Sequence, residues 1–210
     1  MKVSTKEKIM DEALTLFSIN GFKGTSVKSI AHAVGIRDSS IYKHFRSKRE
    51  IFNAIVAQIG KRMESLADTL GLPSEENGEG ICAFYGDLSL EKLQELSRKC
   101  FLFYLQDPFV SRFWRMAQLE QYQNQEIYQV FRKIFMEDSI AYQKAIFAEM
   151  VEKKLFQPVD PEVLAISFYA PIYFLLSKYA GRPAQAQEAL KILDKQVAEF
   201  YRNYNTQQST

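Results

Sequence analysis

The sequence predicts an all-α protein, and three observations lead to this prediction. Every sustained apolar pattern in the 210 residues repeats with a helical period. No segment alternates apolar and polar residues between turn signals, so strands are not expected. Glycine, proline and capping residues separate the apolar runs. We expect about nine helices, forming an N-terminal three-helix head with a helix-turn-helix and a larger C-terminal helical bundle.

Capping residues and glycines mark the first two helices. Ser4 and Glu7 form a capping box that opens the first helix, and Gly21 ends it with a left-handed cap. Thr25 or Ser26 then caps a short second helix. The apolar faces of the two helices carry Ile9, Ala13, Leu16 and Phe17, and Val27, Ile30, Ala31 and Val34.

The next segment is short, polar and basic. Residues 35–52 read GIRDSSIYKHFRSKREIF and contain five Lys or Arg residues and three serines. A helix is expected at about 38–44, with only Ile41 and Phe45 facing inward. The other side chains of this helix therefore remain available to solvent or to a partner.

A second capping box opens a long helix. Ser47 and Glu50 form the box, and the helix stops at residues 71–73. The acidic stretch PSEENGEG at 73–80 is rich in helix breakers and is the best linker. The predicted domains are a helix-turn-helix domain at 1–47 with its motif at about 26–45, a connecting helix at 48–72, and a C-terminal helical ligand-binding and dimerisation domain at 73–210.

Five further helices are expected in the C-terminal domain. Prolines and capping residues place them at about 90–105, 108–122, 125–154, 160–180 and 183–204. The apolar run at 163–177 is too short to span a bilayer and contains Pro171, so it is interpreted as a helix buried in protein. The N-terminus has no apolar signal core. Neither secretion nor membrane association is expected.

Charge is distributed unevenly along the chain. The net charge is +2, but residues 1–62 carry twelve Lys or Arg and five Asp or Glu, whereas the rest carries fifteen and twenty. A basic head on an acidic body indicates that only the head meets a polyanion, and nucleic acid is the obvious polyanion.

Two short helices joined by a glycine-containing turn, with a helix before them, describe a helix-turn-helix. The second helix enters the major groove, where Arg can read guanine and Ser can bind a base edge or a phosphate. Lys48 lies at a helix N-terminus, where backbone amides favour a phosphate. The residues predicted to bind DNA are Thr25, Ser26, Lys28, Arg37, Ser39, Ser40, Tyr42, Lys43, His44 and Lys48.

Each of these residues also has an interpretation without DNA. The basic residues could form a solvated face, and His44 could pack against the turn into the fourth helix. Thr25 and Ser26 are plausible helix caps, and a cap at such a helix end can also donate to a phosphate.

The segment TSVKSIAHAVGIRDSSIYKHFRSKREIF, residues 25–52, resembles the N-terminal signature of the tetracycline-repressor (TetR) family of bacterial regulators. The matching features are Thr25, Ile30, Ala31, Gly35, Tyr42, His44-Phe45, Ser47-Lys48 and Ile51. The resemblance covers about the first 60 residues. Family members commonly place a small polar cap where this chain has Arg37, so either Arg37 or Asp38 could occupy the cap position.

The family resemblance implies that the C-terminal body often encloses an effector pocket. Twelve aromatic residues lie between Phe101 and Phe147, and most of them are expected in the core. An excess of Phe, Tyr and Met suits an apolar or aromatic small-molecule effector. The candidate pocket residues are Phe101, Tyr104, Phe113, Trp114, Met116, Tyr128, Phe131 and Phe135.

The last two helices predict a homodimer. The run at 163–177 is apolar around most of its circumference, and the final helix is apolar along one side. Paired across a two-fold axis, they would form a four-helix interface, as the resemblance implies; the alternative is that both are internal core. A dimer would also read a palindromic operator in double-stranded DNA, because one short helix reads too few bases.

Other classes of function are disfavoured. The sequence has no Gly-rich phosphate loop and no Gly-x-Ser-x-Gly motif, so an enzyme is not expected, and no metal or cofactor is predicted. Two cysteines without metal-site spacing favour a reducing cytoplasm. The sequence therefore predicts a ligand-responsive repressor that binds DNA as a dimer. The alternative is a helical ligand carrier or protein-interaction module with a degenerate helix-turn-helix, whose DNA affinity would hardly depend on salt.

Overall fold

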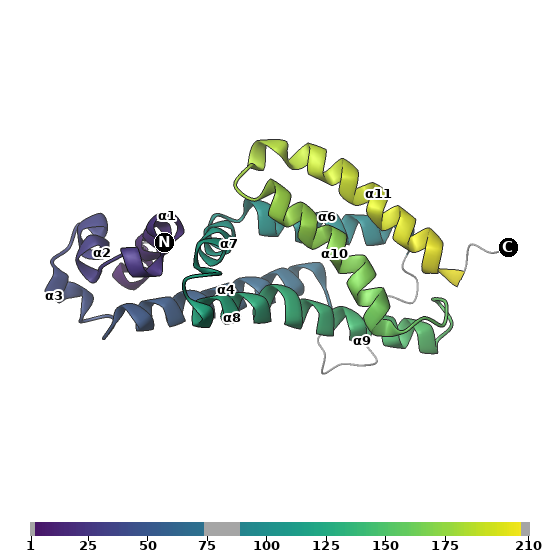
Figure 1. Ribbon diagram of the computed structural model, residues 1–210, viewed down its shortest axis with the longest axis horizontal. Coiled ribbons are helices and arrows are strands. Elements are labelled where there is room, and N and C mark those ends of the chain that lie inside the picture. Colours follow the sequence, from purple (N-terminus) through teal and green to yellow (C-terminus); the bar gives the residue numbers. More distant parts are fainter. Residues whose placement is uncertain (1–2, 74–88, 207–210) are drawn as a thin grey trace. The chain divides into compact units, whose positions relative to one another are not determined.

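The structure, a computed structural model, describes residues 3–73 and 89–206 and is helical in these ranges apart from turns (Figure 1). No strand occurs among these residues, so the predicted all-α class is confirmed. The predicted linker at 73–80 lies outside the described residues, apart from Pro73. Cys82 also lies outside them. The elements are α1 (Thr5–Gly24), α2 (Val27–Val34), α3 (Asp38–Ile41), α4 (Lys48–Leu70), α6 (Leu90–Gln106), α7 (Pro108–Glu120), α8 (Gln125–Arg132), η1 (Lys133–Glu137), α9 (Asp138–Glu152), α10 (Pro161–Tyr179), η2 (Pro183–Gln185) and α11 (Ala186–Tyr204).

The chain forms two compact units that are not consecutive in sequence. Unit 1 contains the residues up to Ser65 together with Asp107–Val130, and unit 2 contains Leu66–Gln106 together with the residues from Phe131 onward. The sequence-based division placed its boundaries near 47 and 72 and followed chain order. In the structure, α7 and most of α8 pack with the N-terminal helices.

Helix α1 begins and bends where its sequence requires. The Ser4 hydroxyl accepts a hydrogen bond from the Glu7 amide, and the Glu7 carboxylate accepts one from the Ser4 amide at 2.8 Å, which confirms the capping box. Gly21 has φ +73° and ψ 168° and interrupts the helix before its last turn. Only glycine adopts this conformation easily, so Gly21 lets the chain turn toward α2.

In unit 1, α1 lies between α2 and α7 (Figure 1). A row of aromatic rings joins α1, α4 and α7: Phe22 lies 5.2 Å from Phe17 and 5.8 Å from Phe52, whose ring stacks on Phe113 at 6.5 Å. Phe17, Phe52 and Phe113 are buried. This packing makes α7 part of the core that supports the helix-turn-helix.

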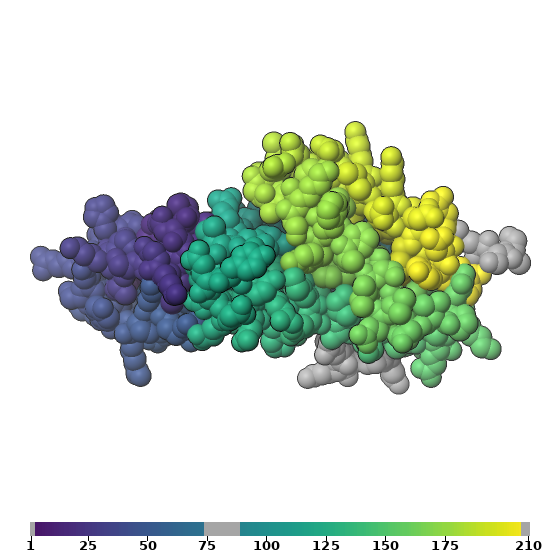
Figure 2. Space-filling model, in the orientation of Figure 1, coloured from purple at the N-terminus to yellow at the C-terminus, as the bar shows by residue number. Residues whose placement is uncertain are grey.

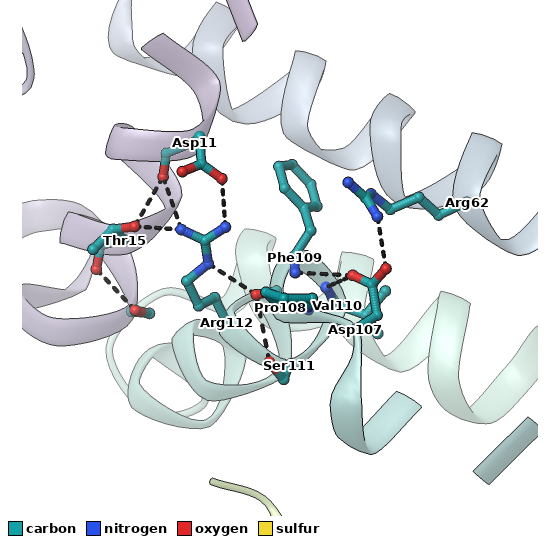
Figure 3. A network of polar contacts seen from close by, with 10 residues as sticks. Asp11, Thr15, Arg62, Asp107, Pro108, Phe109, Val110, Ser111 and Arg112 are labelled. Carbon is teal, nitrogen blue, oxygen red and sulfur yellow. Dashed lines mark hydrogen bonds and ion pairs between the residues drawn. The ribbon is translucent and has the colours of Figure 1, made fainter. Parts of the chain in front are cut away.

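Polar contacts also join α1, α4 and α7 (Figure 3). The Arg112 guanidinium donates to the Asp11 carboxylate and to the Thr15 hydroxyl. Asp107 caps α7 by accepting from the amides of its first turn at 2.9 Å, and its second oxygen pairs with Arg62 at 2.6 Å. Unit 1 is therefore closed by ion pairs between segments far apart in sequence.

In unit 2, α10 packs against α9 and α11, and α11 packs against α6. Arg98 of α6 pairs with Asp194 of α11 at 2.6 Å. The core is aromatic, with the Phe200 ring 5.3 Å from Phe147 and 5.0 Å from Phe168. These contacts place the apolar side of α11 inside its own unit.

The helix predicted at 125–154 contains a π-helical turn. Helix α8 passes into η1, residues Lys133–Glu137, and then into α9. A π turn changes the hydrogen-bond register of a helix, and such turns often occur at functional sites. Here the Tyr169 hydroxyl of α10 donates to the Phe135 carbonyl at 2.6 Å. The turn thus presents a carbonyl to the neighbouring helix.

None of the helices in the described ranges is both long and apolar enough to cross a membrane.

Candidate nucleic-acid interface

The first helix of the helix-turn-helix, α2, is held by caps at both ends. The Ser26 hydroxyl accepts from the Ser29 amide, and the Ser29 hydroxyl in turn accepts from the Ser26 amide, both at 3.0 Å. Gly35 follows the helix with φ +77° and ψ 32°, and its amide donates to the carbonyl of His32. This left-handed glycine forms the turn that the sequence predicted.

The second helix, α3, is short and has no side-chain cap. Arg37 occupies the N-cap position without a capping hydrogen bond, and Asp38 begins the helix. Backbone hydrogen bonds continue the helical path to Phe45, whose amide donates to the Ile41 carbonyl at 3.0 Å. Ile41 and Phe45 are 1% and 2% exposed, so they hold α3 on the core as expected.

The polar side chains of this segment lie on the surface, and Figure 2 shows the surface formed by the dark purple-blue residues of α2 and α3. Lys28, Arg37 and Lys43 are exposed and make no ion pair with any described residue. Among the predicted DNA-binding residues, the exposed ones are Ser26, Lys28, Arg37, Ser39, Tyr42, Lys43 and His44, and Ser40 is half-buried.

Two of the predicted DNA-binding residues have partners inside the protein. Thr25 is 1% exposed, and its hydroxyl donates to the Gly21 carbonyl at 2.9 Å. The Lys48 ammonium donates to the carbonyls of Phe22 at 2.5 Å and Thr25 at 2.7 Å, and it lies 4.4 Å from the Phe22 ring centroid. Partial burial lowers the pKa of Lys48, while the nearby Glu120 charge opposes this effect.

Sequence reasoning missed Glu120, which reaches this site from α7. The residue is 1% exposed, and its Oε1 accepts from the Phe22 amide at 2.7 Å. A signal was present in the sequence, because Phe113, Met116 and Glu120 share one helical face at a spacing of three and four residues. An acidic residue on an otherwise apolar face indicates a buried partner.

The eight residues predicted for an effector pocket are divided between the two units. Phe113, Trp114, Met116 and Tyr128 belong to unit 1, and Phe101, Tyr104, Phe131 and Phe135 belong to unit 2. Phe135 brings part of the second group together, with ring distances of 5.8 Å to Tyr104 and 4.8 Å to Phe131. Burial raises the pKa of Tyr104 far above its usual range.

The two helices predicted to form the dimer interface differ in exposure. On α11, Ala189, Leu193 and Val197 are buried within unit 2, which is the alternative that the sequence left open. On α10, Phe174 is 63% exposed and Val163 is 50% exposed. A largely exposed phenylalanine on an apolar helix marks a surface suited to a partner.

These observations define the class of the N-terminal domain, a helix-turn-helix whose exposed basic residues lie on one segment. Residues 9–55 match the family model described as bacterial regulatory proteins, tetR family. The chain is therefore similar to the tetR family over residues 9–55.

A curated relative matches a segment of similar length. The negative transcriptional regulator IcaR of the biofilm operon icaADBC, from Staphylococcus aureus, is 47% identical over 51 residues. The match covers 24% of this chain and 27% of IcaR, so the chain spans about a quarter of the length of the curated relatives it matches.

Solved structures extend the likeness to the whole fold. A tetR-family transcriptional regulator from Cytophaga hutchinsonii superposes with a TM-score of 0.62 at 14% identity, covering 95% of this chain and 98% of that chain. SmeT in complex with triclosan gives a TM-score of 0.68 at 17% identity, covering 97% of this chain and 93% of SmeT. At such identities the comparison shows the fold alone.

Proposed function

We propose that this protein is a transcriptional repressor that binds double-stranded DNA through its helix-turn-helix. The observation that carries the proposal is the exposed segment of α2 and α3, where Lys28, Arg37 and Lys43 have no ion-pair partner among the described residues, within a region similar to the tetR family. Phosphates attract such charges, and serine and arginine side chains can read base edges. IcaR, the relative with 47% identity over 51 residues, is a negative regulator of transcription, which favours repression.

The salt dependence of DNA binding tests this proposal. A protein that neutralises Z phosphates shows a slope of log K against log salt of about −0.9Z. With several basic residues at the interface, we expect a slope steeper than about −3 for the full chain on duplex DNA. A shallow slope, or no retention of DNA, would favour a ligand carrier or protein-interaction module.

We propose that the repressor is a homodimer that reads a palindrome in the cytoplasm, where bacterial DNA lies. The exposed apolar side chains of α10, including Val163 and Phe174, support pairing through this helix, whereas the apolar side of α11 is used within its own unit. One α3 helix contacts few base pairs, and two helices related by a two-fold axis contact two half-sites.

We propose that an apolar or aromatic small molecule releases the repressor from DNA. SmeT, which shares the fold, was solved with triclosan. In this chain the aromatic cluster of Tyr104, Phe131 and Phe135 beside the π turn supports a site of this kind in unit 2. A ligand acts only if its affinity differs between the two states, and a tenfold loss of DNA affinity needs about 1.4 kcal/mol of coupling.

Enzymatic activity forms no part of the proposal. The family matched by residues 9–55 consists of regulatory proteins.

A further inference from the structure

The two residues that flank the helix-turn-helix contact each other. Thr25 directly precedes Ser26, the N-cap of α2, and Lys48 is the first residue of α4. The Lys48 ammonium donates to the Thr25 carbonyl at 2.7 Å, so one hydrogen bond closes the motif at its base. A bond from a charged donor is stronger than one between neutral groups.

Two charged side chains hold the same turn from opposite sides. The Phe22 amide donates to Glu120 of α7 at 2.7 Å, and the Phe22 carbonyl accepts from Lys48 of α4 at 2.5 Å. The backbone of Phe22 thus lies between a carboxylate and an ammonium group. This turn connects α1 to α2, so its position sets where the helix-turn-helix begins.

The fit around Glu120 is close. A Cβ atom added to Gly21 would lie 2.7 Å from Glu120 Oε1, so any larger residue would displace this carboxylate. Glu120 Oε2 is buried and has no hydrogen-bond partner among the described residues. A buried carboxylate is costly without compensating charge. The Lys48 ammonium binds the same turn, and its charge interacts favourably with that of Glu120.

We propose that Glu120 and Lys48 are positioning residues for DNA binding: together they fix the turn at Gly21–Thr25 and close the helix-turn-helix at its base. Lys48 then acts through Phe22 and Thr25, and not as a phosphate contact. The proposal rests on the proposed DNA-binding function and adds a residue from α7 to it. Operator affinity therefore depends on a side chain 72 residues beyond Lys48 in the chain.

A double-mutant cycle on the full chain tests the proposal. Lys48→Met, Glu120→Gln and the double variant are compared with the wild type by fluorescence anisotropy, on a duplex that the wild type selects from a random pool, at several salt concentrations. We expect each single variant to lose at least tenfold in affinity for DNA. The double variant should bind DNA at least as tightly as the more affected single variant, because each charge is most harmful without the other. The salt slope of Lys48→Met should stay within half a unit of the wild-type slope.

Matched controls separate positioning from other effects. Lys43→Met removes an exposed cation and should reduce the salt slope by about one unit. Glu126→Gln makes the same chemical change at a carboxylate that is 67% exposed and should change affinity less than twofold. Thermal unfolding shows whether each variant is folded under the binding conditions.

A local readout remains if Glu120→Gln is poorly folded. Hydrogen exchange at the Phe22 amide in free protein should be faster in Lys48→Met than in the wild type, because the turn loses one of its two anchors. The inference is wrong if wild-type protein binds DNA and the two single variants bind equally well, if Lys48→Met reduces the salt slope by about one unit, or if exchange at Phe22 is unchanged. If the wild type selects no DNA, the proposed function itself fails.

Discussion

At the scale of single residues, Lys43 and Lys48 show that the same residue type takes different environments in one short segment. Lys43 is exposed on the turn that continues α3 and has no ion-pair partner among the described residues. Lys48 is half-buried and donates to two backbone carbonyls. The sequence alone does not distinguish the two lysines. Their environments differ because Lys48 packs against the Gly21–Thr25 turn.

A first prediction concerns an exposed DNA-facing residue. Replacing Arg37 with Ala should weaken operator binding by about 1–3 kcal/mol if Arg37 reads a base, and relax sequence preference at one position. The free energy of unfolding of the Arg37→Ala variant should hardly differ from that of the wild type, because Arg37 is exposed and makes no capping hydrogen bond. Competition binding with duplexes altered at single positions measures both effects. Unchanged affinity and preference would place Arg37 outside the interface.

A second prediction concerns Gly21. Alanine at this position must adopt φ near +73° and place its Cβ against Glu120, so Gly21→Ala should reduce the free energy of unfolding by about 1–3 kcal/mol. Gly60→Ala is the matched control, because Gly60 lies within α4 with nothing near its Cβ position. That change should raise stability by about 0.4–1 kcal/mol. Urea unfolding measures both, and equal effects at the two glycines would contradict the assigned role of Gly21.

A third prediction concerns Cys100. Burial raises the pKa of this thiol to about 11, so it should react slowly with thiol reagents at pH 8 in folded protein and quickly in denaturant. A Cys82→Ser background restricts the measurement to Cys100. Rapid labelling of native protein would contradict the burial of this thiol.

At the scale of helices, local sequence signals predicted how elements begin and end, and could not predict which elements pack together. The Ser4 and Glu7 capping box and the Gly35 turn depend on residues within one turn of each other, and both are confirmed. The packing of α7 on α1 joins residues about 100 positions apart, as in the pairing of Arg112 with Asp11. Such contacts depend on the whole fold and cannot be inferred from local sequence. The sequence-based division therefore assigned α7 to the C-terminal domain, because α7 follows the predicted linker in the chain.

The π turn between α8 and α9 was also beyond sequence reasoning. The apolar pattern from 125 to 154 suits one continuous helix, and the shift at Lys133–Glu137 changes its hydrogen-bond register without a glycine or proline to mark it. The bond from Tyr169 to Phe135 lies at this shift. Because the donor of this hydrogen bond lies on α10, the sequence around Phe135 does not indicate it.

A fourth prediction follows from burial of Tyr169 between these helices. Burial raises the pKa of this phenol to about 12 from an ordinary value near 10. The folded state therefore retains the proton longer than the unfolded state, so this contribution to stability is full below pH 10 and is lost as pH rises from 10 to 12. The loss should approach about 2–3 kcal/mol.

Urea unfolding at pH 8 to 12 measures this effect. Tyr169→Phe should be less stable at pH 8, because it loses the bond to Phe135, but its stability should fall less steeply above pH 10 than that of the wild type. Tyr122→Phe, at a residue 88% exposed, should leave the pH dependence unchanged. Identical curves for wild type and Tyr169→Phe would contradict the assigned environment.

At the scale of the whole molecule, reading a palindromic operator requires two copies of the chain. Phe174 is 63% exposed on α10, and a glutamate there would place charge in the proposed interface. We expect Phe174→Glu to sediment as a monomer at micromolar concentration, with an unchanged helical circular dichroism spectrum and at least a hundredfold weaker operator binding. Gln196→Glu adds the same single charge at an exposed residue of α11 and serves as a control for surface charge.

The most direct measurement of the central claim is to sequence the DNA that the full-length protein selects from a random duplex pool. Two α3 helices related by a two-fold axis should enrich an inverted repeat whose half-site centres lie one helical turn apart or a multiple of it, about 34–36 Å per turn. No enriched sequence, or a single asymmetric site, would contradict a dimeric reader of DNA.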